Sequence, residues 1–264
     1  MALSVYLNIP CLTNGLSRYE ESKAYKSERF FPAIAIHSPY AIHPIFTRKV
    51  LESARADGVK VSAHLLESPA EREWLDNSTG EMLEFFESFL QQSRSLISSK
   101  EFIKDFEGID TIFTHALELN KDDKKLLAES NHSIAHCPVS NRLLNNKKLD
   151  LSISEGVNVA LGTDGYSSNV SLNMFDEMRS ALNVHESTNL EDLAKQLLTM
   201  ATLNGAKALG LNSGVLAKER DADMLVIELP EDFKEGSNIY SNIILHTQKP
   251  KQIYINGALI DGIS

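Results

Sequence analysis

The chain has 264 residues, which is enough for one large domain or for a barrel with a small appendage. Hydrophobic residues make up 42% and charged residues 23%, as in ordinary soluble globular proteins. The balance of 26 basic against 36 acidic residues argues against a nucleic-acid partner, because phosphate binding requires clustered positive charge.

Neither a membrane span nor a disulfide framework is predicted. No apolar run approaches the roughly 18 residues of a membrane helix, and the N-terminus lacks the charged-then-apolar pattern of a signal peptide. Two cysteines, Cys11 and Cys137, make no disulfide network and are expected to be buried apolar residues. The sequence therefore predicts a cytoplasmic protein with no membrane partner.

Short apolar runs that end in a polar residue alternate with helical patterns along the chain. The predicted strands are residues 5–9, 33–37, 59–64, 111–115, 133–138 and 157–164. Helices are expected within residues 16–29, from Pro44 to Gly58, after the capping-box pattern that begins at Ser68, and from Asn120 to Glu129. Further helices are expected near residues 172–182 and 190–209.

Strands that alternate with helices are typical of a parallel α/β barrel. A closed (β/α)8 barrel of the TIM type needs eight strands and only six are predicted, so we expect an incomplete barrel over residues 1–209 that lacks the first two. Two further strand patterns, residues 221–228 and 251–257, predict a small β-rich appendage over residues 210–264.

The segment 157–164 carries the most informative pattern. Bulky side chains alternate there with small or polar ones, and Asp164 is the last residue of the second set. This alternation would place Asp164 at the C-terminal tip of a barrel strand, where barrel enzymes keep their active sites. Taken alone, the Gly- and Ser-rich loop after it fits an Asx-type turn equally well.

Other strand ends favour the functional alternative. His37, His64 and His115 end three other predicted strands, His136 lies near the end of a fourth, and Glu67 follows His64 by three residues. Each histidine alone is more often a hydrogen-bonded core residue, but polar groups that converge inside a barrel need partners. Imidazole and carboxylate suit zinc or iron, and a nearby Glu could move a proton, so the pattern predicts metal-assisted hydrolysis.

These motifs resemble the amidohydrolase superfamily, in its branch of aminohydrolases that deaminate purine-like rings or dechlorinate triazines. The resemblance covers nearly the whole chain. The matching motifs, in the order of the family, are His37-Ser38-Pro39-Tyr40, His64-Leu65-Leu66-Glu67, Thr114-His115-Ala116, His136-Cys137-Pro138-Val139-Ser140-Asn141 and Gly162-Thr163-Asp164-Gly165 with Ser168-Asn169. Within the branch, residues 68–75 and 141–144 are similar to aminodeoxyfutalosine deaminases, which serve menaquinone biosynthesis.

The resemblance implies a role for each matching residue. It makes His64 and Asp164 ligands of one divalent transition metal, either zinc or iron, with zinc favoured. Glu67 would shuttle protons and contact the substrate, His115 would lie beside the metal and the substrate, and Asp164 would also act as a base. It implies that His37 and Ser168 contact a small purine-like substrate and that His136 is structural.

One departure from the family pattern leaves alternatives open. Family members carry a His-x-His pair on the first barrel strand, and no His-x-His occurs in this chain. We therefore expect the C-terminal part of a longer deaminase, whose partner is a missing N-terminal segment or a second copy of the chain. The alternatives are a non-catalytic remnant, an interaction protein that uses exposed barrel edges, a methylthioadenosine or S-adenosylhomocysteine deaminase, and a triazine hydrolase.

Overall fold

The structure is a computed structural model that describes residues 9–27, 30–186, 189–230, 233 and 238–260. By its internal contacts the chain divides into two compact units. One comprises Met1–Ile134 and Asp150–Val157, and the other Ala135–Leu149 and Asn158–Ser264.

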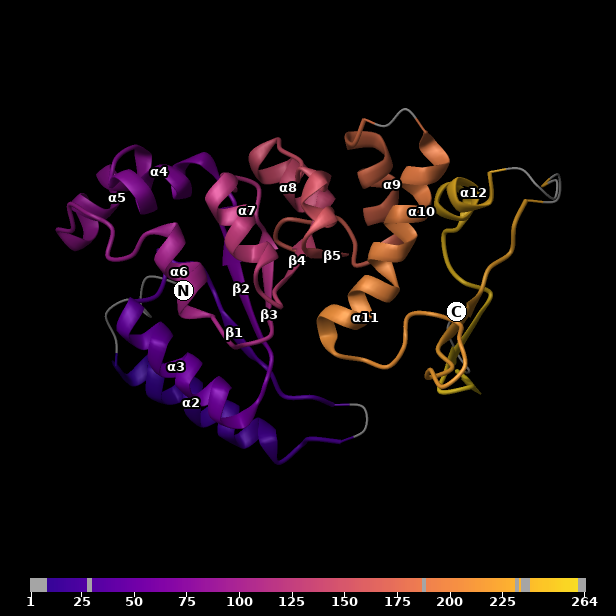
Figure 1. Cartoon of the computed structure of the whole chain (residues 1–264), viewed down its shortest axis with the longest axis horizontal. Coiled ribbons are helices and arrows are strands. Elements are labelled where there is room, and N and C mark those ends of the chain that lie inside the picture. The colour runs from indigo at the N-terminus through magenta and orange to yellow at the C-terminus, as the bar shows by residue number, and fades with distance from the viewer. Residues whose placement is uncertain (1–8, 28–29, 187–188, 231–232, 234–237, 261–264) are drawn as a thin grey trace. The chain divides into compact units, whose positions relative to one another are not determined.

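The first unit alternates helices with strands (Figure 1). In chain order its elements are α2 (Ile9–Lys23), β1 (Ile34–Ile36), α3 (Pro44–Asp57), β2 (Val61–Leu65), α4 (Pro69–Asn77), α5 (Glu81–Leu90), α6 (Ser99–Asp105), β3 (Thr111–His115), α7 (Lys121–Ala128) and the 3-10 turn η1 (Leu151–Glu155). Helices α2 and α3 lie side by side in Figure 1, and Tyr19 and Lys23 of α2 both contact the carboxylate of Asp57.

Strands β1, β2 and β3 form one sheet with β4 (Ser133–His136) and β5 (Asn158–Leu161), in that order. The pairings of β1 with β2 and of β2 with β3 are parallel. Because parallel strands end at the same edge, the residues that follow β1, β2 and β3 are neighbours there.

Local signals in the sequence explain where these helices begin and end. Helix α3 has proline as its first residue, and Gly58 ends it with a φ of 62°, a left-handed conformation that glycine adopts without strain. Helix α4 follows the N-cap Ser68, whose hydroxyl accepts a hydrogen bond from Glu71 N. The predicted capping box is only half formed, because the Glu71 carboxylate bonds Leu66 N and Glu67 N.

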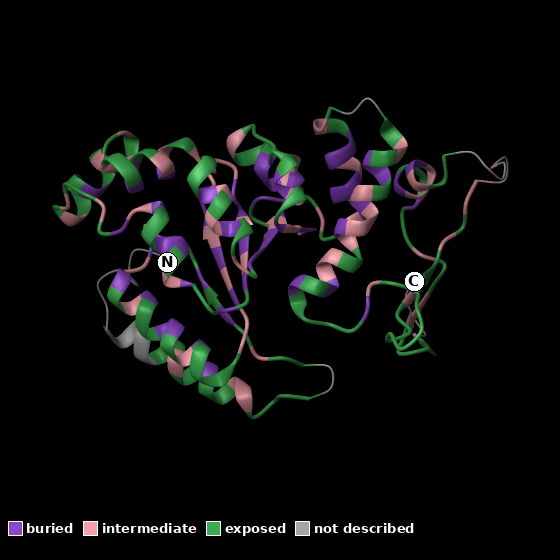
Figure 2. Ribbon diagram, viewed as in Figure 1, coloured by how far each residue is buried: buried purple, intermediate pink, exposed green. Residues whose placement is uncertain are grey.

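Aromatic side chains form much of the core of the first unit. Phe102, Phe106 and Phe113 are buried, and their ring centroids lie 4.9 to 6.4 Å apart. Trp74 of α4 stacks on Phe86 of α5 with centroids 4.6 Å apart. Figure 2 shows buried residues on the strands and on one side of the surrounding helices, as expected for helices that cover a sheet.

We expect Trp74→Ala to lower the free energy of unfolding by about 3–5 kcal/mol, because it leaves a cavity beside Phe86. Trp74 is 1% exposed. Phe89→Ala is the matched control, because Phe89 is 70% exposed and should change the same quantity by less than about 1 kcal/mol. Urea unfolding measures both, and equal losses would contradict this account of the α4–α5 core.

The second unit contains a helical part and a small sheet. Its remaining elements are α8 (Pro138–Asn145), α9 (Met174–Val184), α10 (Leu190–Ala201), α11 (Leu203–Leu209), β6 (Met224–Val226), α12 (Ile239–His246), β7 (Gln252–Ile255) and β8 (Ala258–Leu259). Strands β6, β7 and β8 pair antiparallel. The Glu191 carboxylate of α10 accepts hydrogen bonds from Tyr240 N and Ser241 N in the first turn of α12.

Five of the six predicted barrel strands are confirmed, as are the two strands of the appendage. The sixth strand was predicted over residues 5–9. This prediction is wrong at Ile9, which begins helix α2, and residues 5–8 lie outside the described residues. A short apolar run does not distinguish a strand from the first turn of a helix, and Pro10 fits a helix start. The helix predicted within residues 16–29 is confirmed up to Lys23.

The parallel sheet is consistent with the predicted barrel class. That the barrel is incomplete, and that the β-rich appendage begins at residue 210, stay predictions. None of the helices in the described ranges is both long enough and apolar enough to cross a membrane.

Candidate functional site

The ends of β2 and β3 bring His64 and His115 together. The register pairs His64 with Thr114 and Leu65 with His115, so strict alternation would place the two imidazoles on opposite faces of the sheet. Their ring centroids are nevertheless 5.3 Å apart. His115 has a φ of 74°, and this left-handed backbone breaks the alternation at the strand tip.

His37 follows β1 and lies beside His64. Their rings stack with centroids 4.9 Å apart, and His64 Nδ1 lies 3.3 Å from the carbonyl oxygen of His37. Ser38 Oγ lies 2.7 Å from His37 Nδ1. An Nδ1–H that donates to a carbonyl leaves the Nε2 lone pair of His64 available, which is the form of imidazole that binds a metal.

Glu67 lies in the loop after β2, where it faces His115. Glu67 Oε1 is 3.7 Å from His115 Nε2, and His115 is fully buried whereas Glu67 is partly exposed. The separation exceeds a direct hydrogen bond, so one small bridging molecule could link the two groups. The structure thus brings together the predicted proton shuttle and the imidazole predicted beside the substrate.

Asp164 follows β5, with a φ of 58°. Its Oδ2 accepts hydrogen bonds from Ser140 Oγ at 2.6 Å and Ser168 Oγ at 2.9 Å, and its Oδ1 accepts one from Gly165 N at 2.8 Å. Ser140 belongs to α8, so Asp164 is more than the local turn residue that its loop alone would allow. These donors fix the orientation of the carboxylate.

Of the two serines that bond to Asp164, only Ser168 was predicted from the sequence as a site residue. Ser168 is 8% exposed and donates to Asp164, and its predicted contact with the substrate stays a prediction. Ser140 was not among the predicted site residues, although it lies in the motif from His136 to Asn141. It is fully buried, and its hydroxyl holds Asp164 from a different element.

Glu177 of α9 supports the loop that carries Asp164. It is fully buried, and its carboxylate accepts hydrogen bonds from Asn169 Nδ2 and from Val139 N at the start of α8. Asn169 Nδ2 also donates to the carbonyl oxygen of Thr163. Burial raises the pKa of Glu177. Its only signal in the sequence was a place in a helical pattern.

His136 is buried and pairs with the partly exposed His185, and the structural role that the resemblance implies for His136 stays a prediction. Its Nε2 is 2.9 Å from His185 Nε2, and its Nδ1 is 3.2 Å from Asn141 Nδ2. If the Asn141 amide donates to Nδ1, then Nε2–H of His136 donates to His185. Burial lowers the pKa of His185 to about 4, and the charge of Lys148 adds to the effect.

We expect the free energy of unfolding to decrease as the pH falls from about 6.5 to about 4 through protonation of His185. Folding lowers the pKa of His185 from 6.5 to about 4. The stability linked to its neutral form is therefore fully present above pH 6.5 and is lost as the pH falls to about 4. The loss should be about 1–2 kcal/mol, because the partly exposed ring is screened by solvent. Urea unfolding over this pH range measures it.

His185→Gln keeps an acceptor for His136 but does not titrate, and it should flatten this part of the pH profile. His246→Gln replaces an exposed histidine of α12 and is the matched control. An unchanged pH dependence in His185→Gln would show that other groups are responsible.

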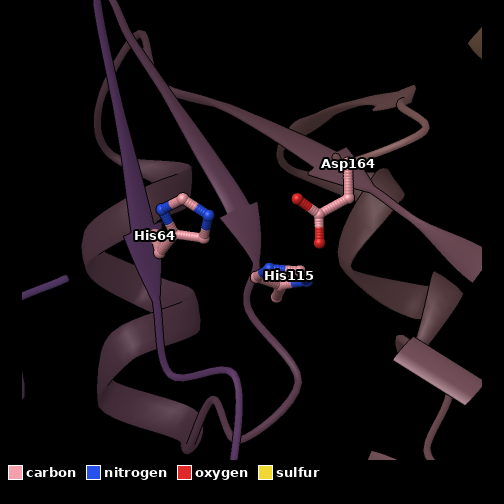
Figure 3. A group of neighbouring side chains, drawn as sticks. All are labelled: His64, His115 and Asp164. Atoms are coloured by element: carbon pink, nitrogen blue, oxygen red, sulfur yellow. The ribbon is translucent and has the colours of Figure 1, made fainter. Parts of the chain in front are cut away.

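Within the described residues, His64, His115 and Asp164 form a group that could hold a metal ion. Each offers one ligand atom, and these atoms all lie within 4.8 Å of one another. Figure 3 shows the three side chains pointing toward one another. Two imidazole nitrogens and a carboxylate oxygen are suitable donors for zinc or iron, so the residues fit the predicted cofactor.

Comparison with known proteins decides the family. The sequence model of the amidohydrolase family matches residues 11–260. The chain belongs to the amidohydrolase family. This amidohydrolase is 44% identical over 242 residues to an aminodeoxyfutalosine deaminase from a Nitratiruptor species, covering 92% of this chain and 60% of that protein. It is 34% identical over 250 residues to an adenosine deaminase from Helicobacter pylori, covering 91% of this chain and 60% of that protein.

Solved structures show the same fold. The crystal structure of Helicobacter pylori aminofutalosine deaminase superposes with a TM-score of 0.91 at 32% identity, covering 98% of this chain and 66% of that chain. This amidohydrolase spans about 60% of the length of the curated relatives that it matches.

Proposed function

We propose that this chain takes part in the metal-dependent hydrolytic deamination of an adenosine-like substrate, with aminodeoxyfutalosine as the specific candidate. The observation that carries the proposal is the position of Glu67, 3.7 Å from His115 and three residues after His64, at one edge of the sheet. The identity to an aminodeoxyfutalosine deaminase supports the choice of substrate, and with it a role in menaquinone biosynthesis.

In this proposal His64 and Asp164 hold one divalent transition metal. When bound, the metal lowers the pKa of a water molecule toward about 7. Glu67 would act as the proton shuttle, which accepts a proton from the attacking water and delivers it to a nitrogen of the substrate. The water oxygen adds to the ring carbon, and the two water protons go to the adjacent ring nitrogen and to the amino nitrogen. The carbon–nitrogen bond to the amino group then breaks, ammonia leaves, and the ring keeps the oxygen as a carbonyl beside an N–H.

The other site residues orient the reactants. In this proposal His115, which is buried and faces Glu67, donates a hydrogen bond to oxygen at the reacting carbon. In this proposal His37, which is exposed and stacks beside His64, contacts the substrate. Ser168, which also donates a hydrogen bond to Asp164, is proposed as a second substrate contact.

Ammonia release tests the proposal. Adenosine, 5′-deoxyadenosine and 6-amino-6-deoxyfutalosine should be offered to the purified chain, alone and co-expressed with an N-terminal piece that carries a His-x-His pair. Since the chain contains no His-x-His, we expect metal-dependent turnover chiefly in the co-expressed sample. No turnover and no bound transition metal in either sample would favour the alternative of a non-catalytic interaction protein.

A further inference from the structure

Glu71 is a buried carboxylate that the proposed reaction does not use. It is the third residue of α4 and is 1% exposed. Its Oε1 accepts a hydrogen bond from Leu66 N at 3.0 Å, and its Oε2 accepts one from Glu67 N at 2.8 Å. One side chain therefore binds two consecutive peptide N–H groups, which fixes the orientation of both peptide planes.

The turn formed by Leu66 and Glu67 contains a strained backbone conformation. Leu66 has a φ of 50°, a left-handed conformation that a leucine adopts only when its surroundings enforce it. Its side chain is fully buried, and its carbonyl oxygen accepts hydrogen bonds from Leu117 N and Glu118 N. The carbonyl side of the turn is thus attached to the segment after β3, and the N–H side is attached to Glu71.

We propose that Glu71 is a positioning residue, whose ionised carboxylate holds the Leu66–Glu67 turn so that the Glu67 carboxylate stays beside His115. The inference rests on the proposed role of Glu67 as the proton shuttle. In the ionised form neither carboxylate oxygen carries a proton, so each oxygen can accept a hydrogen bond from one of the two N–H groups. Protonation turns one oxygen into a hydroxyl donor, which competes with one of the two bonds.

The surroundings of Glu71 place this change near neutral pH. Burial raises the pKa of Glu71 to about 7 against the lowering effect of the two N–H bonds. Among the charged and titratable groups that act on it, the charge of Glu67 raises the value and that of Arg72 lowers it, and Tyr40 interacts with the same carboxylate. The turn should therefore be held at pH 8 and loosened at pH 6.

Global stability should change in the opposite direction, which separates this effect from general unfolding. The folded state raises the pKa of Glu71 from 4.5 to about 7. The stabilisation linked to this group is present below pH 4.5 and is lost as the pH rises through 7. Acidification from pH 8 to 6 therefore loosens the turn while this carboxyl makes the fold more stable.

Amide NMR of the 264-residue chain tests the proposal without any need for turnover. In the wild-type protein, the Leu66 and Glu67 amide signals should move together with a midpoint near pH 7. In Glu71→Gln this movement should vanish, and the two amides should exchange with solvent at least about tenfold faster at pH 8, as expected on losing a bond to a charged group. Glu73→Gln, an exposed change on the same helix, should leave both signals unchanged.

Two results would overturn the proposal. One is a pair of wild-type amide signals that do not titrate together between pH 6 and 8. The other is a folded Glu71→Gln protein whose Leu66 and Glu67 amides exchange as slowly as in the wild type. If Glu71→Gln does not fold, the wild-type titration alone decides.

Turnover gives an independent readout. In an active deaminase, Glu71→Gln should lower kcat more than it raises KM, and it should remove the change in rate near pH 7. Titrating amides, together with no turnover in the sample co-expressed with the N-terminal piece, would leave the role of Glu71 in place and count against the proposed deaminase. Turnover with amides that do not titrate would count against Glu71 alone.

Discussion

Glu67→Gln is expected to reduce deamination by about 10²–10⁴-fold, because a glutamine at this position cannot accept and return a proton. The change removes one negative charge and keeps the size of the side chain, so metal content and substrate affinity should remain. Ammonia release under saturating substrate measures the rate, and elemental analysis of the purified protein measures the metal. The expected result is a large loss in kcat with little change in KM.

Glu52→Gln is the matched control for this change. Glu52 is exposed on α3, so the variant carries the same loss of charge away from His115 and should keep the parental rate. If Glu67→Gln retains more than about a tenth of the parental turnover, Glu67 is not the proton shuttle. Loss of metal together with loss of turnover would indicate that Glu67 contributes to metal binding.

Asp164→Asn should weaken transition-metal binding by at least about 100-fold and abolish metal-dependent turnover, because an amide is a poor replacement for an anionic ligand. Ser140→Ala and Ser168→Ala each remove one hydrogen bond to Asp164 Oδ2. They should weaken binding less, by about 10-fold, since a residue that orients a ligand matters less than the ligand itself. Titration of the metal-free protein with zinc, followed by calorimetry, gives the affinities.

The exposed Asp192 of α10 provides the control for charge, and Asp192→Asn should bind zinc as the parent does. The ranking of the three site variants is the decisive outcome. An Asp164→Asn protein that binds zinc with parental affinity would show that Asp164 is not a ligand, and His64 with His115 would then need a different third group.

Much of the first unit follows from local sequence patterns. The alternating apolar runs indicated the strands that end near His37, His64 and His115, and proline and glycine marked the ends of α3. These predictions succeeded because burial of one face and the backbone preferences of Pro and Gly act over only a few residues. The spacing of His64 and Glu67 also placed both at one end of β2 without any knowledge of their neighbours.

The contacts that orient the site depended on the tertiary structure. Alternation alone would separate His115 from His64, and only the left-handed backbone at His115 turns the ring toward its partner. The bond from Ser140 to Asp164 joins residues 24 positions apart, and Glu177 joins two further segments. Glu71 resembled a capping residue in the sequence, yet its carboxylate holds the turn of Glu67.

The reason is physical. Residue type and local periodicity determine which side chains can reach the end of a strand, and these are properties of a short segment. Which hydrogen bonds a buried carboxylate makes depends on every donor that folding brings within about 3 Å, because a buried charge must find partners wherever they are. The sequence by itself therefore determined the family, the strand ends and the candidate ligands, whereas only the tertiary structure decided how His115, Asp164 and Glu67 are held.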